Sequence, residues 1–210
     1  MNSRGWIRQT PIMTESEREE SSARPGSGRA FLSRIKKALR CLPFWRGLAL
    51  PDLAAQLIFW PLMAAGLTLD LWSKSAVFNW LRQQQSNSVS IIDGCLQLVV
   101  MENKGAAFGI AAGQYHLLVA VSVIALVVIF AVFLLGGTRQ KLIHIALALF
   151  AAGVCGNLYD RIFNNGLVRD FIDVYYRQYH WPAFNVADSM LCVGVGLMII
   201  SSFRAPKRSS

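Results

Sequence analysis

Four long apolar segments constrain the fold of this chain more than any other feature of its sequence. An α-helix needs about 20 mostly apolar residues to cross a bilayer, and four segments approach that length: 53–71, 115–135, 141–162 and 186–203. Only 16% of the residues are charged, whereas soluble domains carry about 25%. We therefore predict four transmembrane helices. We expect Pro61 to kink the first of them unless neighbouring groups re-satisfy the freed carbonyl.

The basic residues predict how these helices are oriented. The chain has 21 Lys and Arg against 12 Asp and Glu, and ten of the basic residues precede residue 52. Two more lie between the second and third segments and three follow the fourth, which places 15 on one side. In a membrane protein such a bias marks the cytoplasmic side, so we expect both termini in the cytoplasm and no nucleic-acid partner. The links 73–114 and 163–185 then face outward.

The parts outside the spans differ in character. The first 29 residues are rich in Ser, Arg, Glu, Pro and Gly and have no apolar period, so they favour disorder. The next stretch combines an apolar stripe with basic residues, which suits a helix lying on the inner leaflet or a positive flank that sets topology. We assign a disordered cytoplasmic extension, a basic amphipathic juxtamembrane segment, a membrane domain and a cytoplasmic tail to residues 1–29, 30–52, 53–203 and 204–210.

The first outward link carries a hairpin signal. β-branched residues flank Asp93-Gly94, a dipeptide suited to a two-residue type I′ turn. The second outward link begins with turn residues and continues with apolar and aromatic ones, so we expect it to fold against the membrane face. The predicted fold class is an all-α membrane protein, with four transmembrane helices and a small extracytoplasmic β-hairpin.

Polar residues inside or at the edge of a span are costly and are therefore candidates for function. Asp70 and Lys74 are four residues apart, close enough to pair on a helix, although such a pair at a helix end is also common without a function. Asn103 precedes a run of small residues, which lets the backbone approach a neighbour closely. Any tight outer loop could show the same pattern.

The remaining polar groups meet at one membrane face. Asn157, Asp160 and Arg161 lie at the outer end of the third span, and Asp170 and Asp173 follow within thirteen residues of Asp160. At the outer start of the fourth span stand Asn185 and Asp188. Either residue could simply cap the helix, but several carboxylates at one depth raise one another's pKa. The cysteines and histidines are scattered without metal-type spacing, so we expect no metal.

In this order the motifs resemble the lipoprotein signal peptidase family, also called signal peptidase II. The resemblance runs from about residue 53 to residue 203. It rests on five blocks: Asp70 with Lys74; Asn103, Gly105, Ala106, Ala107 and Phe108; Gly156, Asn157, Asp160 and Arg161; Gly166, Val168, Asp170 and Phe171; and Phe184, Asn185, Ala187, Asp188 and Ser189. The chain departs from many relatives in having four residues, IFNN, between Arg161 and Gly166. That departure leaves open the position of Asp170 relative to Asp160.

The resemblance implies an aspartyl endopeptidase of the bacterial inner membrane. Such an enzyme cleaves diacylglyceryl-modified prolipoproteins just before the lipidated Cys and uses no cofactor. The catalytic pair carried over is Asp170 and Asp188, two carboxylates that share one proton. The positioning residues carried over are Asp70, Lys74, Asn103, Asn157, Asp160, Arg161 and Asn185. We expect a monomer in contact with membrane lipid, with its active site near the extracytoplasmic face. The alternative is a small carrier or channel component in which the aspartates form a proton path.

Overall fold

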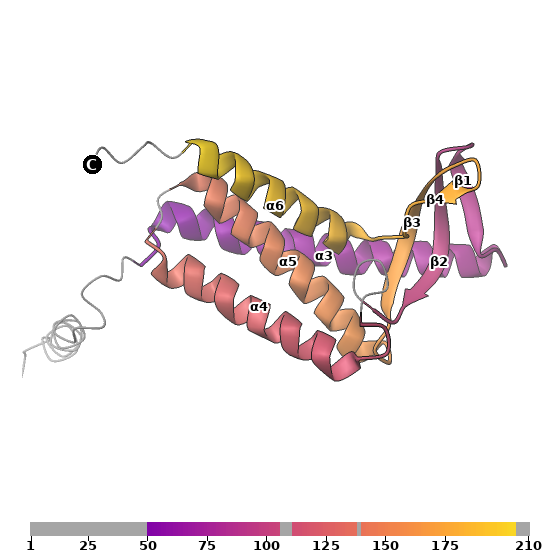
Figure 1. The fold of residues 1–210 in the computed structure, drawn as a ribbon, viewed down its shortest axis with the longest axis horizontal. Helices are drawn as coiled ribbons and strands as arrows, with labels where there is room; N and C mark the ends of the chain where they lie inside the picture. The colour runs from indigo at the N-terminus through magenta and orange to yellow at the C-terminus, as the bar shows by residue number, and fades with distance from the viewer. Residues whose placement is uncertain (1–49, 106–110, 138–139, 205–210) are drawn as a thin grey trace, which may run out of the picture. The chain divides into compact units, whose positions relative to one another are not determined.

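A computed structural model of the chain describes residues 50–105, 111–137 and 140–204. The predicted disordered extension, most of the juxtamembrane segment and nearly all of the C-terminal tail lie outside these ranges. The described chain contains four helices that are long and apolar enough to cross a membrane, as predicted. They are α3 (Leu53–Gln83), α4 (Tyr115–Leu135), α5 (Lys141–Phe163) and α6 (Val186–Arg204) (Figure 1).

The first helix is longer than its apolar segment. It continues through Pro61 and past residue 71 to Gln83. Its beginning is fixed by Asp52, whose carboxylate accepts the backbone N–H of Ala55 at 2.8 Å. Beyond the apolar segment its inner face still buries Phe78 and Leu81, and the helix contacts strands of the outer sheet there. Packing against the sheet therefore extends the helix beyond its apolar run.

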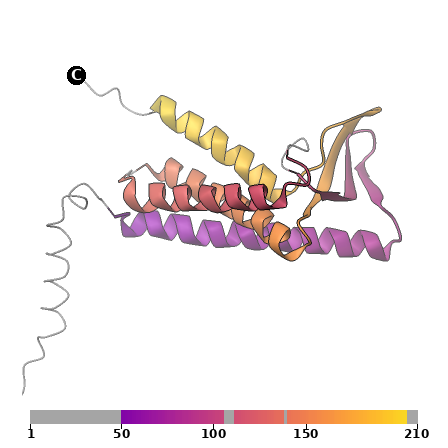
Figure 2. The ribbon, with the colours of Figure 1, turned by 60° about the horizontal axis from the view of Figure 1, so that its bottom comes forward.

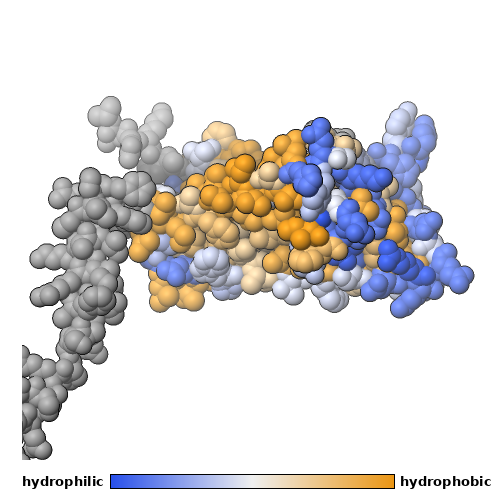
Figure 3. Space-filling model, turned by 90° about the horizontal axis from the view of Figure 1, so that it is seen from below, coloured by the Kyte–Doolittle hydropathy of each residue, from blue (hydrophilic) through white to orange (hydrophobic). Residues whose placement is uncertain are grey.

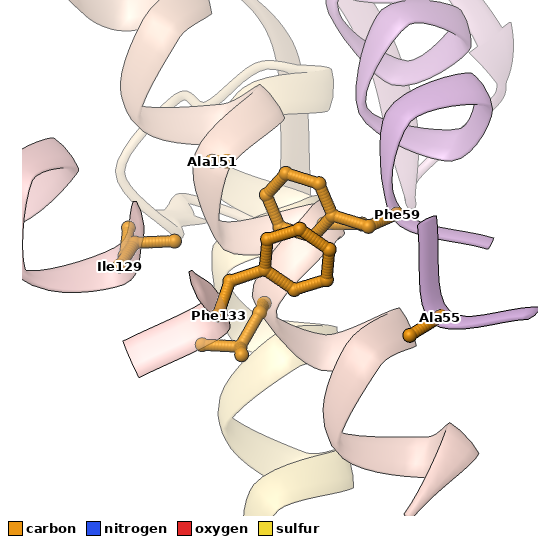
Figure 4. Close-up of a cluster of buried hydrophobic side chains, with 7 residues drawn as sticks. Ala55, Phe59, Ile129, Phe133 and Ala151 are labelled. Carbon is orange, nitrogen blue, oxygen red and sulfur yellow. The ribbon is translucent and has the colours of Figure 1, made fainter. Parts of the chain in front are cut away.

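Helix α5 packs against each of the other three helices. The apolar core joins α3, α4 and α5, and at its centre the rings of Phe59 and Phe133 stack with their centroids 3.9 Å apart (Figure 4). In contrast, Val121, Ile124 and Val128 of α4 leave about half of each residue's surface exposed. Apolar side chains cover the side of the helical bundle, and hydrophilic ones gather at the end that carries the sheet (Figure 3). This distribution suits a bundle surrounded by lipid.

One glycine brings the first and third spans together. A Cβ atom added to Gly156 of α5 would collide with the carboxylate of Asp70 on α3. Small residues let membrane helices approach closely, and here the approach places a charged side chain of α3 directly against the backbone of α5. The contact lies at the level of the candidate site.

The prediction of an all-α fold is wrong in one respect, because a four-stranded antiparallel sheet stands at one end of the bundle (Figure 2). Its strands are β1 (Ser88–Ile92), β2 (Leu96–Asn103), β3 (Val168–Tyr176) and β4 (Tyr179–His180), in the order β1-β2-β3-β4. The expected hairpin forms β1 and β2, and the second outward link adds the other two strands. An isolated hairpin is only marginally stable in water, which gives a physical reason for the additional strands.

The turn of the first hairpin also differs from the prediction. Gly94 has a φ of +78°, whereas Asp93 is not among the residues with positive φ, and a type I′ turn requires positive φ at both positions. The N–H of Cys95 donates to the carbonyl of Ile92 at 3.0 Å. Positive φ at the second central residue alone fits a type II turn. Three residues, 93–95, therefore separate the paired ends Ile92 and Leu96.

Candidate active site

Helix α6 begins with a reciprocal cap made by two of the predicted site residues. The side-chain oxygen of Asn185 accepts the backbone N–H of Asp188 at 3.0 Å, and the Asp188 carboxylate accepts the backbone N–H of Asn185 at 3.2 Å. This is the arrangement of a capping box. It fixes the position of the Asp188 carboxylate at the first turn of the helix.

Asn185 also connects the cap to strand β3. Its amide nitrogen donates to Asp170 at 2.7 Å and to the side-chain oxygen of Asn157 at 3.2 Å. From α5, Asn157 in turn donates to the carboxylate of Asp188 at 2.8 Å. The two aspartates proposed from the sequence are therefore joined through a pair of asparagines, although they belong to different elements.

The register of the sheet adds a third asparagine. Met101 of β2 pairs with Asp170 of β3, and two residues further along β2 the amide of Asn103 donates to the second oxygen of Asp170 at 3.1 Å. Asn103 also accepts the N–H of Gly105 at 2.8 Å. Both oxygens of the Asp170 carboxyl group are thus fixed by amide donors from separate elements.

The two aspartates differ in environment. Asp170 is 2% exposed, whereas Asp188 is only partly buried. Burial, and next the negative charge of Asp188, raise the pKa of Asp170 to about 7, although the amide donors of Asn103 and Asn185 favour its ionised form. Near neutral pH this carboxyl group therefore exchanges a proton readily, while its partner remains accessible to water.

Behind this pair lies a buried group of charges. The ammonium group of Lys74 is 2.7 Å from Asp70 and 3.3 Å from Asp160, and it donates to Asn157 at 3.1 Å. Asp70 accepts the N–H of Ala187 at 2.8 Å. The Asp70, Lys74 and Asp160 side chains have no exposed surface, and charges so buried persist only when they are paired and hydrogen-bonded. The pair predicted from the spacing of Asp70 and Lys74 is confirmed.

Arg161 holds the segment that follows β2. Its guanidinium group donates to the carbonyl of Gly105 at 3.1 Å and to that of Asn157 at 3.4 Å. The small-residue stretch noted in the sequence, at 106–108, lies outside the described residues. All nine residues proposed for the site are described, and their contacts lie at the junction of α3, α5, α6 and the sheet.

The IFNN segment forms the last residues of α5 and the turn after it. Asn164 and Gly166 donate to the carbonyls of Asp160 and Arg161, so the turn closes and β3 begins at Val168. Asp173 lies outside the asparagine network. It contacts Gln97 at 2.6 Å and His180 at 2.8 Å.

Sequence reasoning missed Arg169. Its side chain donates to Asp160 from two nitrogens, at 2.7 and 3.1 Å, and to Ser75 at 3.2 Å, while its backbone N–H donates to the other oxygen of Asp160. The one available signal is its position, next to Asp170 in a segment expected to fold against the membrane. Across residues 50–105, 111–137 and 140–204, no three His, Cys, Asp or Glu side chains are arranged to hold a metal ion.

Comparison with known proteins gives one consistent result. Residues 62–204 match the family described as Signal peptidase (SPase) II. The Lipoprotein signal peptidase of Geobacter sulfurreducens is 41% identical over 156 residues, which cover 73% of this chain and 96% of that protein. The protein of the same name from Halalkalibacterium halodurans is 37% identical over 143 residues, covering 68% of this chain and 90% of the relative.

The fold is also similar to that of a solved protein. A bacterial membrane enzyme whose structure was determined by the in meso method superimposes with a TM-score of 0.64 at 25% sequence identity. The superposition covers 78% of this chain and 96% of that protein. The similarity therefore extends over the helices and the sheet together.

Proposed function

Because the chain belongs to the signal peptidase II family, we propose that it is an aspartyl endopeptidase of diacylglyceryl-modified prolipoproteins. It cuts each precursor just before the lipid-bearing Cys. The observation that carries the catalytic assignment is the joining of Asp170 to Asp188 through Asn185 and Asn157. An accessible carboxylate beside a buried carboxyl group of raised pKa is what acid–base hydrolysis of a peptide bond requires.

The environments of the two aspartates favour a different role for each. Asp170, with its pKa near 7, holds the shared proton and donates a hydrogen bond to the scissile carbonyl oxygen. Asp188, partly exposed at the start of α6, takes a proton from a water molecule as that water attacks the carbonyl carbon. The tetrahedral intermediate collapses when the C–N bond breaks and Asp188 passes the proton taken from water to the leaving nitrogen. Asn103, Asn157 and Asn185 hold the two carboxyl groups in place throughout.

The other predicted residues support this pair. Asp70 and Lys74 brace α3 against α5 and α6, and Asp160 completes the pairing of Lys74. Arg161 fixes the backbone at Gly105, from which the following loop can contact the substrate. These are positioning roles, because the groups reach the dyad only through Asn157 or through the backbone.

The chain is a multi-pass protein of the bacterial inner membrane, and its substrate is a lipoprotein precursor. We place the active site near the extracytoplasmic face and both termini in the cytoplasm, as the 15-to-6 partition of basic residues favours. The acyl chains remain in the bilayer, so the precursor enters sideways between spans into a monomer. A proton carrier would need ionisable groups at several depths, but α4 contains no Asp, Glu, Lys or Arg.

The test is cleavage of a purified precursor. The full chain should convert a diacylglyceryl-modified prolipoprotein to its mature size and should process the unlipidated precursor poorly. Asp170→Asn and Asp188→Asn should each lower turnover at least about a thousandfold, and the double variant should be little worse, because the two residues act as one unit. Asp173→Asn is the matched control and should retain activity. Full activity in either single dyad variant would overturn the catalytic assignment.

A further inference from the structure

Arg169 lies on the opposite side of β3 from Asp170, as neighbouring residues of a strand do. It lines a pocket of about 260 Å³ together with Asp160, Ser75, Tyr159, Phe163 and Asn164. Neither Asp170 nor Asp188 lines this pocket. The Arg169 side chain is 19% exposed, while the Asp160 side chain that it holds has no exposed surface.

Among the side chains that salt bridges connect to Lys74, the charges balance only when Arg169 is counted. Asp70 and Asp160 carry two negative charges and Lys74 carries one positive charge. Arg169 supplies the second positive charge through two side-chain bonds to Asp160. An uncompensated buried charge is strongly unfavourable. The stability of the charged group of Asp70, Lys74 and Asp160 therefore depends on Arg169.

A continuous series of contacts connects Arg169 to the dyad. Arg169 holds Asp160, and Asp160 lies 3.3 Å from the ammonium group of Lys74. Lys74 also donates to the side-chain oxygen of Asn157, which leaves the amide nitrogen of Asn157 to donate to Asp188. The oxygen of the Asn157 amide is therefore held by Lys74 together with Asn185. The position of Lys74 depends on how much negative charge Asp160 presents.

We propose that Arg169 is a positioning residue for the peptidase reaction. By neutralising the charge of Asp160, it maintains the hydrogen bond from Lys74 to Asn157 and, through it, the hydrogen bond from Asn157 to Asp188. The inference rests on the proposed function. It assigns a role to a position that the block from Gly166 to Phe171 leaves unspecified, and the role depends mainly on the charge of Arg169 and less on the fork geometry of its guanidinium group.

Loss of the charge should change how Asp170 titrates. The charged and titratable groups in and around the dyad are Asp70 and Lys74 on α3, Asp160 and Arg161 on α5, Asp170 on β3 and Asp188 on α6. Removing the positive charge of Arg169 leaves the whole group more negative. Carboxyl groups in a more negative surrounding ionise at higher pH, so the pH–rate profile should move upward.

The experiment compares Arg169→Lys with Arg169→Gln in the full chain, using kcat against pH for the lipidated precursor. Arg169→Gln should lose about tenfold in kcat and shift the profile upward by up to about half a pH unit, because Arg169 carries one partly exposed charge. Arg169→Lys keeps the charge but loses the fork, so it should lose only a few-fold and keep the profile of the parent chain. If Arg169 had a purely structural role, the two variants would show the same dependence of kcat on pH.

The pocket permits a second readout. In Arg169→Ala the vacated space opens to solvent, so guanidinium at millimolar concentration should restore part of the lost kcat by pairing with Asp160. The control is Arg82→Ala, because Arg82 lies 3.9 Å from Glu102 with 63% of its side chain exposed and contacts neither the dyad nor its asparagines. Guanidinium should leave that variant unchanged.

The outcomes separate the two proposals. If the parent chain cleaves the precursor and both Arg169→Lys and Arg169→Gln show the pH profile of the parent, the proposed role of Arg169 is wrong. The proposed peptidase activity then still holds. The same holds if Arg169→Lys shifts the profile as far as Arg169→Gln, or if guanidinium fails to restore Arg169→Ala. A parent chain that does not cleave the lipidated precursor overturns the peptidase, and the role of Arg169 with it.

Discussion

Replacing Asp170 by Asn should stabilise the folded chain at pH 8 more than at pH 5. The pKa of Asp170 is raised from 3.8 to about 7 in the folded chain, so between these values the folded state binds a proton that the unfolded state has lost. Stability therefore falls as pH rises through this window. Asn carries no charge at either pH, and the variant escapes that loss.

The size of this change in the free energy of unfolding follows from the pH range over which only the folded state binds the proton. Each pH unit costs about 1.4 kcal/mol where the two states differ by one proton. From pH 5 to the folded pKa near 7 there are roughly two units, which sets an upper bound of about 3 kcal/mol. For a chain of this size each kcal/mol moves Tm by about 2–4 °C, so the stability advantage of Asp170→Asn should grow by as much as roughly 6–12 °C.

A second contribution of Asp170→Asn is independent of pH. Both oxygens of Asp170 accept amide donors, from Asn103 and Asn185, and an asparagine offers only one acceptor oxygen. The variant therefore loses about one hydrogen bond, worth about 1 kcal/mol, at every pH. Its Tm at pH 5 should consequently equal or lie slightly below that of the parent chain.

The assay is thermal unfolding of the purified protein in detergent at pH 5, 6, 7 and 8. Asp93→Asn serves as the control, because Asp93 is an exposed turn residue bonded only to Ser90 among the contacts of the described chain. Its Tm difference from the parent should stay constant. If the difference for Asp170→Asn also stays constant or shrinks toward pH 8, Asp170 does not hold the proton and the assignment of acid and base is wrong.

Four further predictions address the fold and the site. Gly156→Ala should lower Tm by an amount equivalent to about 1–3 kcal/mol, because the added methyl group forces Asp70 away from α5; an unchanged Tm would show that the helices adjust freely. Asn185→Ser keeps a helix-capping residue but loses both amide donors, so turnover should fall at least about a hundredfold while Tm changes by only a few degrees; wild-type turnover would remove Asn185 from the site. Deletion of residues 1–29 should leave cleavage within a few-fold of the full chain, and a much larger loss would give the extension a role in catalysis or folding. Reporter fusions after residues 25 and 210 should report the cytoplasm and one after residue 95 should not; an outward C-terminus would contradict four spans.

Much of the helical architecture could be predicted because apolar length is a local property. The second span was predicted at 115–135 and forms Tyr115–Leu135, and the other spans begin at their predicted residues. The continuation of α3 to Gln83 could not be read from hydropathy. Its outer turns carry polar residues and are held by Phe78 and Leu81, whose burial depends on a sheet formed by segments distant in sequence.

The sheet illustrates the same limit. The hairpin signal at Asp93-Gly94 is local, and β1 and β2 do form around it. Strand β3 pairs with β2 across more than 60 residues of sequence, and its buried positions mix the acids Asp170 and Asp173 with the apolar Val168 and Phe171. That pattern has no simple apolar period, because the buried positions of β3 hold site carboxyl groups as well as apolar side chains.

Arg169 could not be predicted for a related reason. An arginine near a membrane face is common, and its partner Asp160 lies nine residues earlier on a different element. The turn after α5 alone decides whether the two meet. Asp70 and Lys74, in contrast, could be paired from the sequence because one helical turn separates them.

The sequence left two interpretations of Asn185 and Asp188 open, a helix cap or a functional site, and in the structure the cap does not exclude the site. An asparagine side chain has an acceptor oxygen and a donor nitrogen. The oxygen of Asn185 caps α6, and its nitrogen binds Asp170 and Asn157. The cap fixes the amide plane, so the nitrogen is aimed at β3 without further restraint. The ordinary chemistry that starts a helix thereby sets the geometry between the two aspartates.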